Sequence, residues 1–229
     1  MNISIIIPNY NGKEILMKFL PKVLKTLPDH EVIVVDDGSC DGTKEKVISL
    51  GPHIIFLEHA LNRGQGAALR TGNEGALKIG AEIIVHIDAD GQHDPACIPA
   101  LIQPLIQGTH DIVFGSRFLG SIPIGIPKTR LLLLQCAKRF NAFFMGIPKT
   151  VTDPQSGIRA MTRFASMHIP FRQDRMAHCS EILQLVTCGS LRWKEVPVDV
   201  RYTEASVRKG QRSTDALKIV WHLLIGIFA

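Results

Sequence analysis

The chain has 229 residues, of which 45% are hydrophobic and 21% are charged. That balance suits one α/β domain, or one domain with a small appendage, and excludes collagen-like, disordered and low-complexity classes. No apolar stretch reaches the roughly 18 residues that a membrane-spanning helix needs. The net charge of +5 is compatible with nucleic acid, an anionic membrane or phosphorylated substrates, and the scattered Lys and Arg residues select none of these.

Short β-branched runs alternate with helical stretches along the first half of the chain. Because these runs are apolar throughout, they are typical of strands buried on both faces of a parallel sheet. The alternation predicts an α/β fold, a doubly wound, mostly parallel sheet with helices on both faces and ligands at the carboxyl ends of its strands. The expected strands are 3–8, 31–36, 53–58, 81–88 and 111–116, and the expected helices are 13–26, 42–49, 65–79 and 95–107.

The second half is less regular but shows no repeat and no linker, so we expect a single domain over 1–229. Its N-terminal part predicts a loop and then a helix that is apolar around much of its circumference. The expected elements are this loop and helix at 118–147, a turn entering a strand at 151–161, a helix at 176–188 and a strand at 191–204.

The chain start and the cysteines favour a cytoplasmic protein. Met1 leads directly into the predicted strand, without the basic region and cleavage site of a signal peptide. The cysteines form no CxxC pair, so we expect reduced thiols. They are Cys40, Cys97, Cys136, Cys179 and Cys188.

Two carboxylates follow the fourth predicted strand. Asp88 and Asp90 can face one cleft if the chain bends there, and like charges at such short range call for a cation. Oxygen ligands suit Mg²⁺ or Mn²⁺, and Gln92 adds an amide oxygen. Because these ligands are few, water and substrate phosphates would complete the coordination shell of the cation. The alternative is an Asx-rich turn with Gly91 at its corner.

Two further segments offer ligand contacts at strand ends. Asp36 and Asp37 can accept hydrogen bonds from a nucleobase or a ribose; alternatively, Asp37 or Ser39 caps the helix that begins near Gly42. The glycine-rich NRGQGAALRTG around Gly64 is similar to a phosphate-binding loop at a helix start. Close backbone packing is the alternative explanation of its glycines.

Arginines of the second half supply cations that match the geometry of phosphate oxygens. Arg117 is the strongest candidate because it directly follows a buried strand, whereas any single one of the others is equally explained by solvation. The set is Arg117, Arg130, Arg159 and Arg201, with the RKGQR loop at 208–212.

Taken in order, these segments resemble the inverting family-2 glycosyltransferases with the GT-A fold, and within them the polyprenyl-phosphate sugar synthases. The resemblance spans about 3–225; each motif alone is loose, but the ordered set is specific. The matching segments are IIIPNYN, VVDDGSCDGT, NRGQGAALRTG, DADGQHDP, GSRF, DPQSGIRA and VPVDVRY.

The resemblance implies transfer of a hexose from a nucleotide sugar, of the GDP-mannose or UDP-glucose type, to a polyprenyl phosphate. The alternative is a family-2 enzyme acting on a glycan or other hydroxyl acceptor, with Asp153 as the base. The implied cofactor is Mg²⁺ or Mn²⁺, bound by Asp88, Asp90 and Gln92. The implied catalytic residues are Asp153, Asp90 and Arg117. The implied substrate contacts are Pro8, Tyr10, Asp36, Asp37, Gly64, Asp88, Arg117, Arg130 and Arg201.

The resemblance also implies peripheral contact with the cytoplasmic face of a membrane and no nucleic-acid partner. Residues 213–229 predict an interfacial amphipathic helix, with 118–147 as the other wall of a lipid groove; a helix packed on the sheet is the alternative. Two positions depart from the family pattern. Gly12 stands where many members carry a glutamate, and Arg212 precedes Ser213 where a lysine is often found.

Two other classes fit the sequence less well. A nucleotidyltransferase usually has a Gly-rich loop with Arg and Lys after the first strand, whereas this chain has PNYNGKE, with one glycine and no arginine. A module that only binds nucleotide or carbohydrate would not need the carboxylate pair.

Overall fold

The computed structural model describes residues 1–88, 90–119, 126 and 128–200, without the side chains of 128–130 and 133. The strands are β1 (Ile3–Asn9), β2 (Glu31–Asp36), β3 (Ile54–Glu58), β4 (Ile83–His86), β5 (Ile112–Ser116), β6 (Arg159–Thr162) and β7 (Trp193–Pro197). The helices are α1 (Lys13–Thr26), α2 (Thr43–Ile48), α3 (Gln65–Lys78), α4 (Ile98–Ile106), α5 (Lys128–Phe144), α6 (Arg163–His168) and α7 (His178–Thr187), with a short 3₁₀ helix, η1 (Pro95–Cys97).

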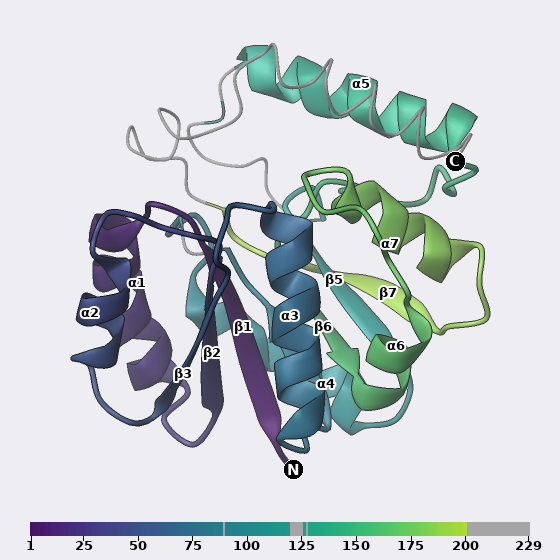
Figure 1. Cartoon of the computed structure of the whole chain (residues 1–229). Coiled ribbons are helices and arrows are strands. Elements are labelled where there is room, and N and C mark those ends of the chain that lie inside the picture. Colours follow the sequence, from purple (N-terminus) through teal and green to yellow (C-terminus); the bar gives the residue numbers. More distant parts are fainter. Residues whose placement is uncertain (89, 120–125, 127, 201–229) are drawn as a thin grey trace.

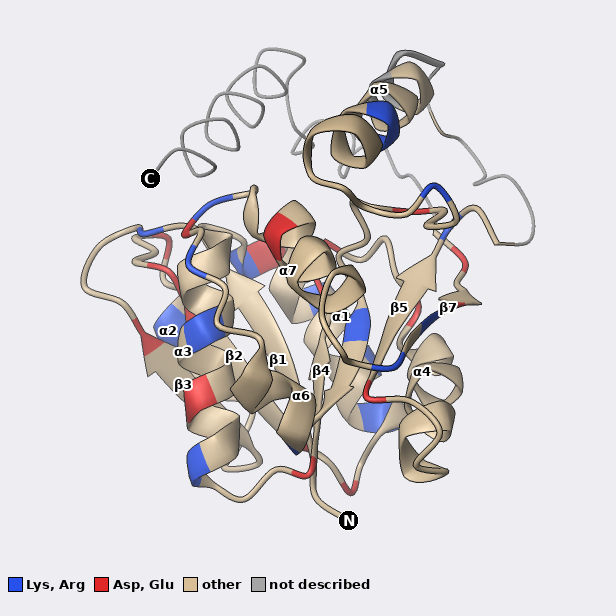
Figure 2. Cartoon of the chain, turned by 90° about the vertical axis from the view of Figure 1, so that its right-hand side faces the viewer, with Lys and Arg blue, Asp and Glu red and all other residues tan. Residues whose placement is uncertain are grey.

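The strands form one seven-stranded sheet in the order β3-β2-β1-β4-β6-β5-β7. All neighbouring pairs are parallel except those of β6, which runs antiparallel to β4 and to β5. The predicted doubly wound, mostly parallel α/β sheet is therefore confirmed. The carboxyl ends of β1 to β5 lie along one edge, and both views place α5 beyond that edge (Figure 1, Figure 2).

Two apolar layers cover the sheet because its central strands are apolar at every position. Ile5 and Ile7 of β1 face the layer that holds α1, α2 and α4, whereas Ile6 faces the layer that holds α3, α6 and α7 (Figure 1). Alternate residues point to opposite faces of a strand, so this uninterrupted run is what a strand covered on both sides requires.

Three predicted elements have different limits. β4 ends at His86, two residues before the predicted end. The helix expected at 95–107 begins as η1, where Asp94 accepts a hydrogen bond from the Ala96 N–H at 3.0 Å, and α4 follows. β7 ends at Pro197, since proline has no N–H to donate to a ladder; Val200 then forms an isolated bridge. Among the described helices, none is long and apolar enough to cross a membrane.

Candidate active site

The end of β4 brings Asp88 to the carboxyl edge of the sheet. β4 pairs with β6 so that His86 lies opposite Arg159 in the last pair of the ladder, and beyond it the Asp88 carboxylate lies against Gly157. A Cβ on Gly157 would lie only 2.0 Å from Asp88 Oδ2, so the missing side chain leaves the space that the carboxylate occupies. Gln65, the first residue of α3, donates from Nε2 to Asp88 Oδ1 at 2.6 Å.

Asp90 and Gln92 lie in the turn that follows. Gly91 has a φ of 71°, and Asp90 Oδ1 accepts a hydrogen bond from the Gln92 N–H at 2.9 Å. This is the Asx-type turn that the sequence offered as an alternative, and it engages one oxygen of Asp90. Burial, together with the negative charge of Asp90, raises the pKa of Asp88 to about 7. The pair is therefore electrostatically strained without a cation.

These residues fit a divalent cation. Asp88 and Asp90 offer hard carboxylate oxygens, and the Asp88 carboxylate has its place beside Gly157 because that residue has no side chain. In the part of the chain that the structure describes, no group of three or more His, Cys, Asp or Glu residues is placed to hold a metal. A cation at this position would thus take its remaining ligands from Gln92, water and a substrate, which is the usual arrangement for Mg²⁺.

Arg117 and Asp153 form a buried ion pair beside this turn. Arg117 follows β5 directly; its Nε lies 2.6 Å from Asp153 Oδ2, and its Nη2 donates to the Gln155 carbonyl at 2.9 Å. Asp153 is 4% exposed, and its Oδ1 is a buried atom with no hydrogen-bond partner among the described residues. A buried acceptor of this kind calls for a ligand or a water molecule.

The acidic pair at the end of β2 is engaged by the chain itself. Asp36 Oδ1 accepts from Asn9 Nδ2 at 2.9 Å and from Ser39 Oγ at 2.6 Å. Asp37 accepts from the N–H groups of Arg63 and Gly64 at 3.0 and 2.7 Å. The two carboxylates therefore hold the loops after β1 and β3 in place.

The helix cap after β2 differs from the predicted one. The N-cap of α2 is Gly42, which has no side chain, and Asp41 just before it, rather than Asp37 or Ser39, accepts a hydrogen bond from the Thr43 N–H at 3.1 Å. Sequence reasoning placed the cap too early because three residues able to cap, at 37, 39 and 41, precede this helix.

Close packing explains the glycines of the NRGQGAALRTG loop. Gly64 has a φ of 116°, and a Cβ on it would lie 2.4 Å from the Asp174 carbonyl oxygen. A Cβ on Gly66 would lie 2.0 Å from the Gln173 carbonyl oxygen. Any larger residue would push the 173–174 segment away from the start of α3. At the neighbouring strand end, Pro8 is half-buried and Tyr10 is 52% exposed.

Comparison with protein families matches the model of glycosyl transferase family 2 to residues 4–169. The chain belongs to glycosyltransferase family 2. It is 33% identical to the UDP-N-acetylglucosamine–dolichyl-phosphate N-acetylglucosaminyltransferase of Methanococcus voltae, over 97% of this chain and 95% of that protein. It is 30% identical to the polyprenol monophosphomannose synthase of Mycolicibacterium smegmatis, over 90% of this chain and 79% of that protein.

A solved structure shows the same fold. Glucosyl-3-phosphoglycerate synthase from Mycobacterium tuberculosis, in complex with Mn²⁺, UDP-glucose and phosphoglyceric acid, superposes with a TM-score of 0.71. The sequences are 21% identical, and the match covers 97% of this chain and 78% of that chain. The GT-A fold that the sequence resemblance implies is thereby confirmed for this glycosyltransferase.

Several predicted phosphate contacts are either buried away from the edge of the sheet or lie outside the described part of the structure. Arg159 is not at the surface, since it is 1% exposed. Arg130 lies in α5, but its side chain is not described. Arg201, Arg212 and the segment 213–229 lie outside the described residues.

Sequence reasoning missed two residues that support the site. Glu195 of β7 accepts hydrogen bonds from the N–H groups of Thr152 and Asp153, both at 2.9 Å, and so fixes the turn that carries Asp153. Gln65 was read as part of the glycine loop, although its side chain reaches Asp88. A single polar residue in a strand or at a helix start gives no pattern from which such a contact can be predicted.

Proposed function

We propose that this glycosyltransferase moves a hexose from a nucleotide sugar to a polyprenyl phosphate, with inversion at the anomeric carbon. Two findings support the acceptor. The relatives described above are named for dolichyl phosphate and polyprenol monophosphomannose. The observation that carries the proposal is an apolar and basic surface on α5, next to the candidate site.

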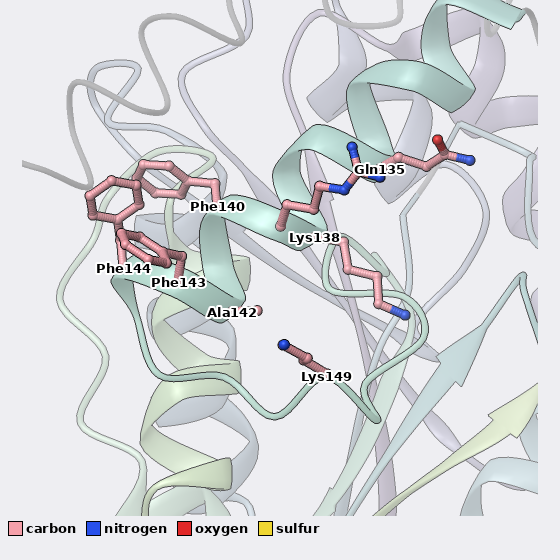
Figure 3. Close-up of a pocket in the computed structure, with 8 residues that line it drawn as sticks. Gln135, Lys138, Phe140, Ala142, Phe143, Phe144 and Lys149 are labelled. Carbon is pink, nitrogen blue, oxygen red and sulfur yellow. The ribbon is translucent and has the colours of Figure 1, made fainter.

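The α5 surface exposes large apolar side chains to solvent. Leu132, Phe143 and Phe144 are 60%, 83% and 53% exposed. Leu132 and Phe143 are eleven residues apart, which is close to three helical turns, so they lie on one side of α5. A groove on this helix is lined by Gln135, Lys138, Arg139, Phe140, Ala142, Phe143, Phe144 and Lys149 (Figure 3).

The charge of this region is of one sign. Residues 112–152 contain no Asp or Glu and six Lys or Arg. Basic side chains beside exposed aromatic rings are typical of surfaces that bind the interface of an anionic membrane. Asn141 donates to Ser180 Oγ at 3.2 Å and so ties the C-terminal half of α5 to α7. The surface is thus anchored to the same layer that carries the site.

The donor would bind at the edge formed by β1, β2 and β4, with Pro8 and Tyr10 beside the nucleoside and Gly64 near the diphosphate. Asp88 and Asp90, with Gln92, would hold Mg²⁺ or Mn²⁺. When bound, such a cation stabilises the charge that develops on the leaving nucleoside diphosphate. Asp36 and Asp37 are predicted substrate contacts that would also fix the loops at this edge.

The acceptor would bind beside Arg117 and Asp153. A phosphate acceptor is ionised at neutral pH, so it needs cations and correct placement more than a base. We propose that Arg117 orients Asp153 and supplies positive charge at this position. Arg130 and Arg201 remain predicted phosphate contacts.

The unpaired oxygen of Asp153 supports a second candidate function. A hydroxyl acceptor must lose its proton to a base, and Asp153 Oδ1 is a buried acceptor without a partner among the described residues. A family-2 transferase that acts on a glycan or another hydroxyl would use this oxygen as the base.

The test is a two-phase assay. Purified protein, Mn²⁺ and a short polyprenyl phosphate are incubated with labelled nucleotide sugars, and the label extracted into organic solvent is counted. We expect extractable label with one donor. Nucleotide release that depends on added glycan, without extractable label, would contradict the lipid acceptor and support the hydroxyl acceptor.

A further inference from the structure

A buried arginine lies on the sheet directly below the candidate metal ligands. In the antiparallel pair of β4 and β6, opposite residues share one face, and the facing pairs become more polar toward the edge. Ile84 faces Met161, and His86 faces Arg159. Beyond this pair, two residues further along each chain, the Asp88 carboxylate lies against Gly157. Arg159 therefore lies one step below Asp88 on the same face of the sheet.

The hydrogen bonds of Arg159 leave its charge uncompensated. Its Nε donates to His86 Nδ1 at 3.1 Å, and His86 Nε2 lies 2.7 Å from Asn73 Oδ1. His86 must therefore carry its proton on Nε2 and be neutral. Burial and the charge of Arg159 hold the pKa of His86 well below its usual range. The histidine orients the arginine but does not neutralise it.

The other ionisable neighbours of Arg159 are also neutral near pH 7. Burial and Arg159 lower the pKa of His178 to about 4, and burial raises the pKa of the Cys179 thiol. Among the described residues, no carboxylate forms an ion pair with Arg159. Buried arginines are rarely left in this state. Burial and the charge of Asp90 raise the pKa of Asp88, and the charge of Arg159 acts on the same carboxylate in the opposite direction.

We propose that Arg159 is a fixed counter-charge for Asp88 that opposes metal binding to the donor-free enzyme and so makes the metal and the nucleoside diphosphate bind cooperatively. The guanidinium is always protonated, so its repulsion of a cation at Asp88 is permanent. A nucleoside diphosphate brings negative charge that offsets both cations. This inference rests on the proposed nucleotide-sugar donor and is independent of the acceptor.

Two substitutions separate charge from packing. Arg159→Gln removes the charge but retains an N–H donor that can reach His86, whereas Arg159→Lys retains the charge. Arg163→Gln is the matched control, because Arg163 is exposed and lies at the other end of β6. The dissociation constant of Mn²⁺ is measured by electron paramagnetic resonance of the free ion, with and without UDP or GDP, and thermal unfolding verifies that each variant is folded.

We expect Arg159→Gln to bind Mn²⁺ alone roughly tenfold more tightly than the wild type does, since a neighbouring opposite charge changes the pKa of a carboxylate by about one unit or more and the same positive charge repels a cation. By linkage, its cooperativity with the nucleotide should fall by the same factor. Arg159→Lys and Arg163→Gln should behave as the wild type.

Unchanged or weaker Mn²⁺ binding by folded Arg159→Gln would overturn the proposal, as would equal weakening in the Gln and Lys variants. If Arg159→Gln does not fold, the wild type still gives a test. A Mn²⁺ affinity that is the same without nucleotide, with UDP and with GDP would overturn the proposed cooperativity. Because no acceptor is present, a failed transfer assay and a failed binding experiment remain distinguishable.

Discussion

Two acidic pairs stand at strand ends of the same edge, and their surroundings differ. At the end of β2, amide and side-chain donors of the chain reach both Asp36 and Asp37. At the end of β4, Asp88 receives one side-chain donor and faces the negative charge of Asp90. The comparison teaches that acidity at a strand end does not by itself identify a ligand site. We expect the donors of the chain that reach each carboxylate to separate a scaffold role from a ligand role.

The largest expected effect is on catalysis at the second pair. Asp90→Asn keeps the size of the side chain and removes one charged ligand, so we expect turnover to fall about 10³-fold or more, with thermal stability unchanged or increased. Initial rates with saturating Mn²⁺ and differential scanning calorimetry measure the two quantities. Asp94→Asn, in the same turn but exposed, is the control. Loss of stability without loss of turnover would place Asp90 with the scaffold pair.

The first pair should show the opposite behaviour. Asp37→Ala leaves two partly buried N–H groups and the His59 ring without their acceptor. We expect the free energy of unfolding to fall by about 3 kcal/mol, measured by urea denaturation. Asp29→Ala, which changes an exposed aspartate, should stay within roughly 0.5 kcal/mol of the wild type. A stable but inactive Asp37→Ala protein would instead support direct contact with the nucleotide.

The pH dependence of stability also separates the pairs. The pKa of Asp88 is about 7 in the fold and near 3.8 when unfolded. Between pH 3.8 and pH 7, Asp88 is protonated in the folded state and ionised in the unfolded state. Its contribution to the stability of the fold is therefore complete at low pH and is lost as pH rises through 7. In EDTA, Asp88→Asn should therefore match the wild type near pH 4 and be more stable by at least about 1 kcal/mol at pH 8.

Urea unfolding at several pH values measures this difference. Asp37→Asn is the matched control, because its wild-type carboxylate is held by donors; this variant should be less stable than the wild type at pH 8. Equal stability of Asp88→Asn and the wild type at all pH values would contradict the electrostatic account of Asp88.

The sequence predicts the fold well because apolar periodicity is a local property. The buried runs of β1, β2 and β5 and the helices α1 and α3 begin and end within two residues of their predicted limits. The pattern does not reveal that β6 inserts antiparallel between β4 and β5, since a four-residue strand carries the same apolar signal in either direction. Neither does it reveal α6, whose six residues span less than two turns.

Sequence reasoning predicts a site residue only where its neighbours in the chain already suggest its role. Asp88 and Asp90 stand out because a carboxylate pair after a buried strand is unusual. The sequence predicts Arg159 as one of several phosphate contacts, whereas pairing with β4 places it inside the sheet, where it is buried. Glu195 gave no signal at all, because its role depends on a turn more than forty residues earlier in the chain. Long-range pairing decides these roles, and a single sequence does not contain it.

A second contrast sets the acid-lined edge against the acid-free α5 surface, and here we expect the smallest effect. Replacing Phe143 and Phe144 by Ser should weaken binding to anionic vesicles roughly tenfold, because two exposed rings lose their place among the lipids. Co-sedimentation with phosphatidylglycerol vesicles measures it, and Phe164→Ser, which changes an exposed ring on α6, is the control.

The basic residues should act through lipid charge alone. Lys138→Gln with Arg139→Gln should reduce binding to anionic vesicles and leave binding to neutral phosphatidylcholine vesicles unchanged, since each basic residue near such a surface contributes about 1 kcal/mol. Added salt should weaken the binding of the wild type to anionic vesicles and should have little effect on the binding of this double variant. If α5 packs against protein instead of lipid, the Phe and the Lys/Arg variants will all sediment as the wild type does, and the lipid acceptor would lose its structural support.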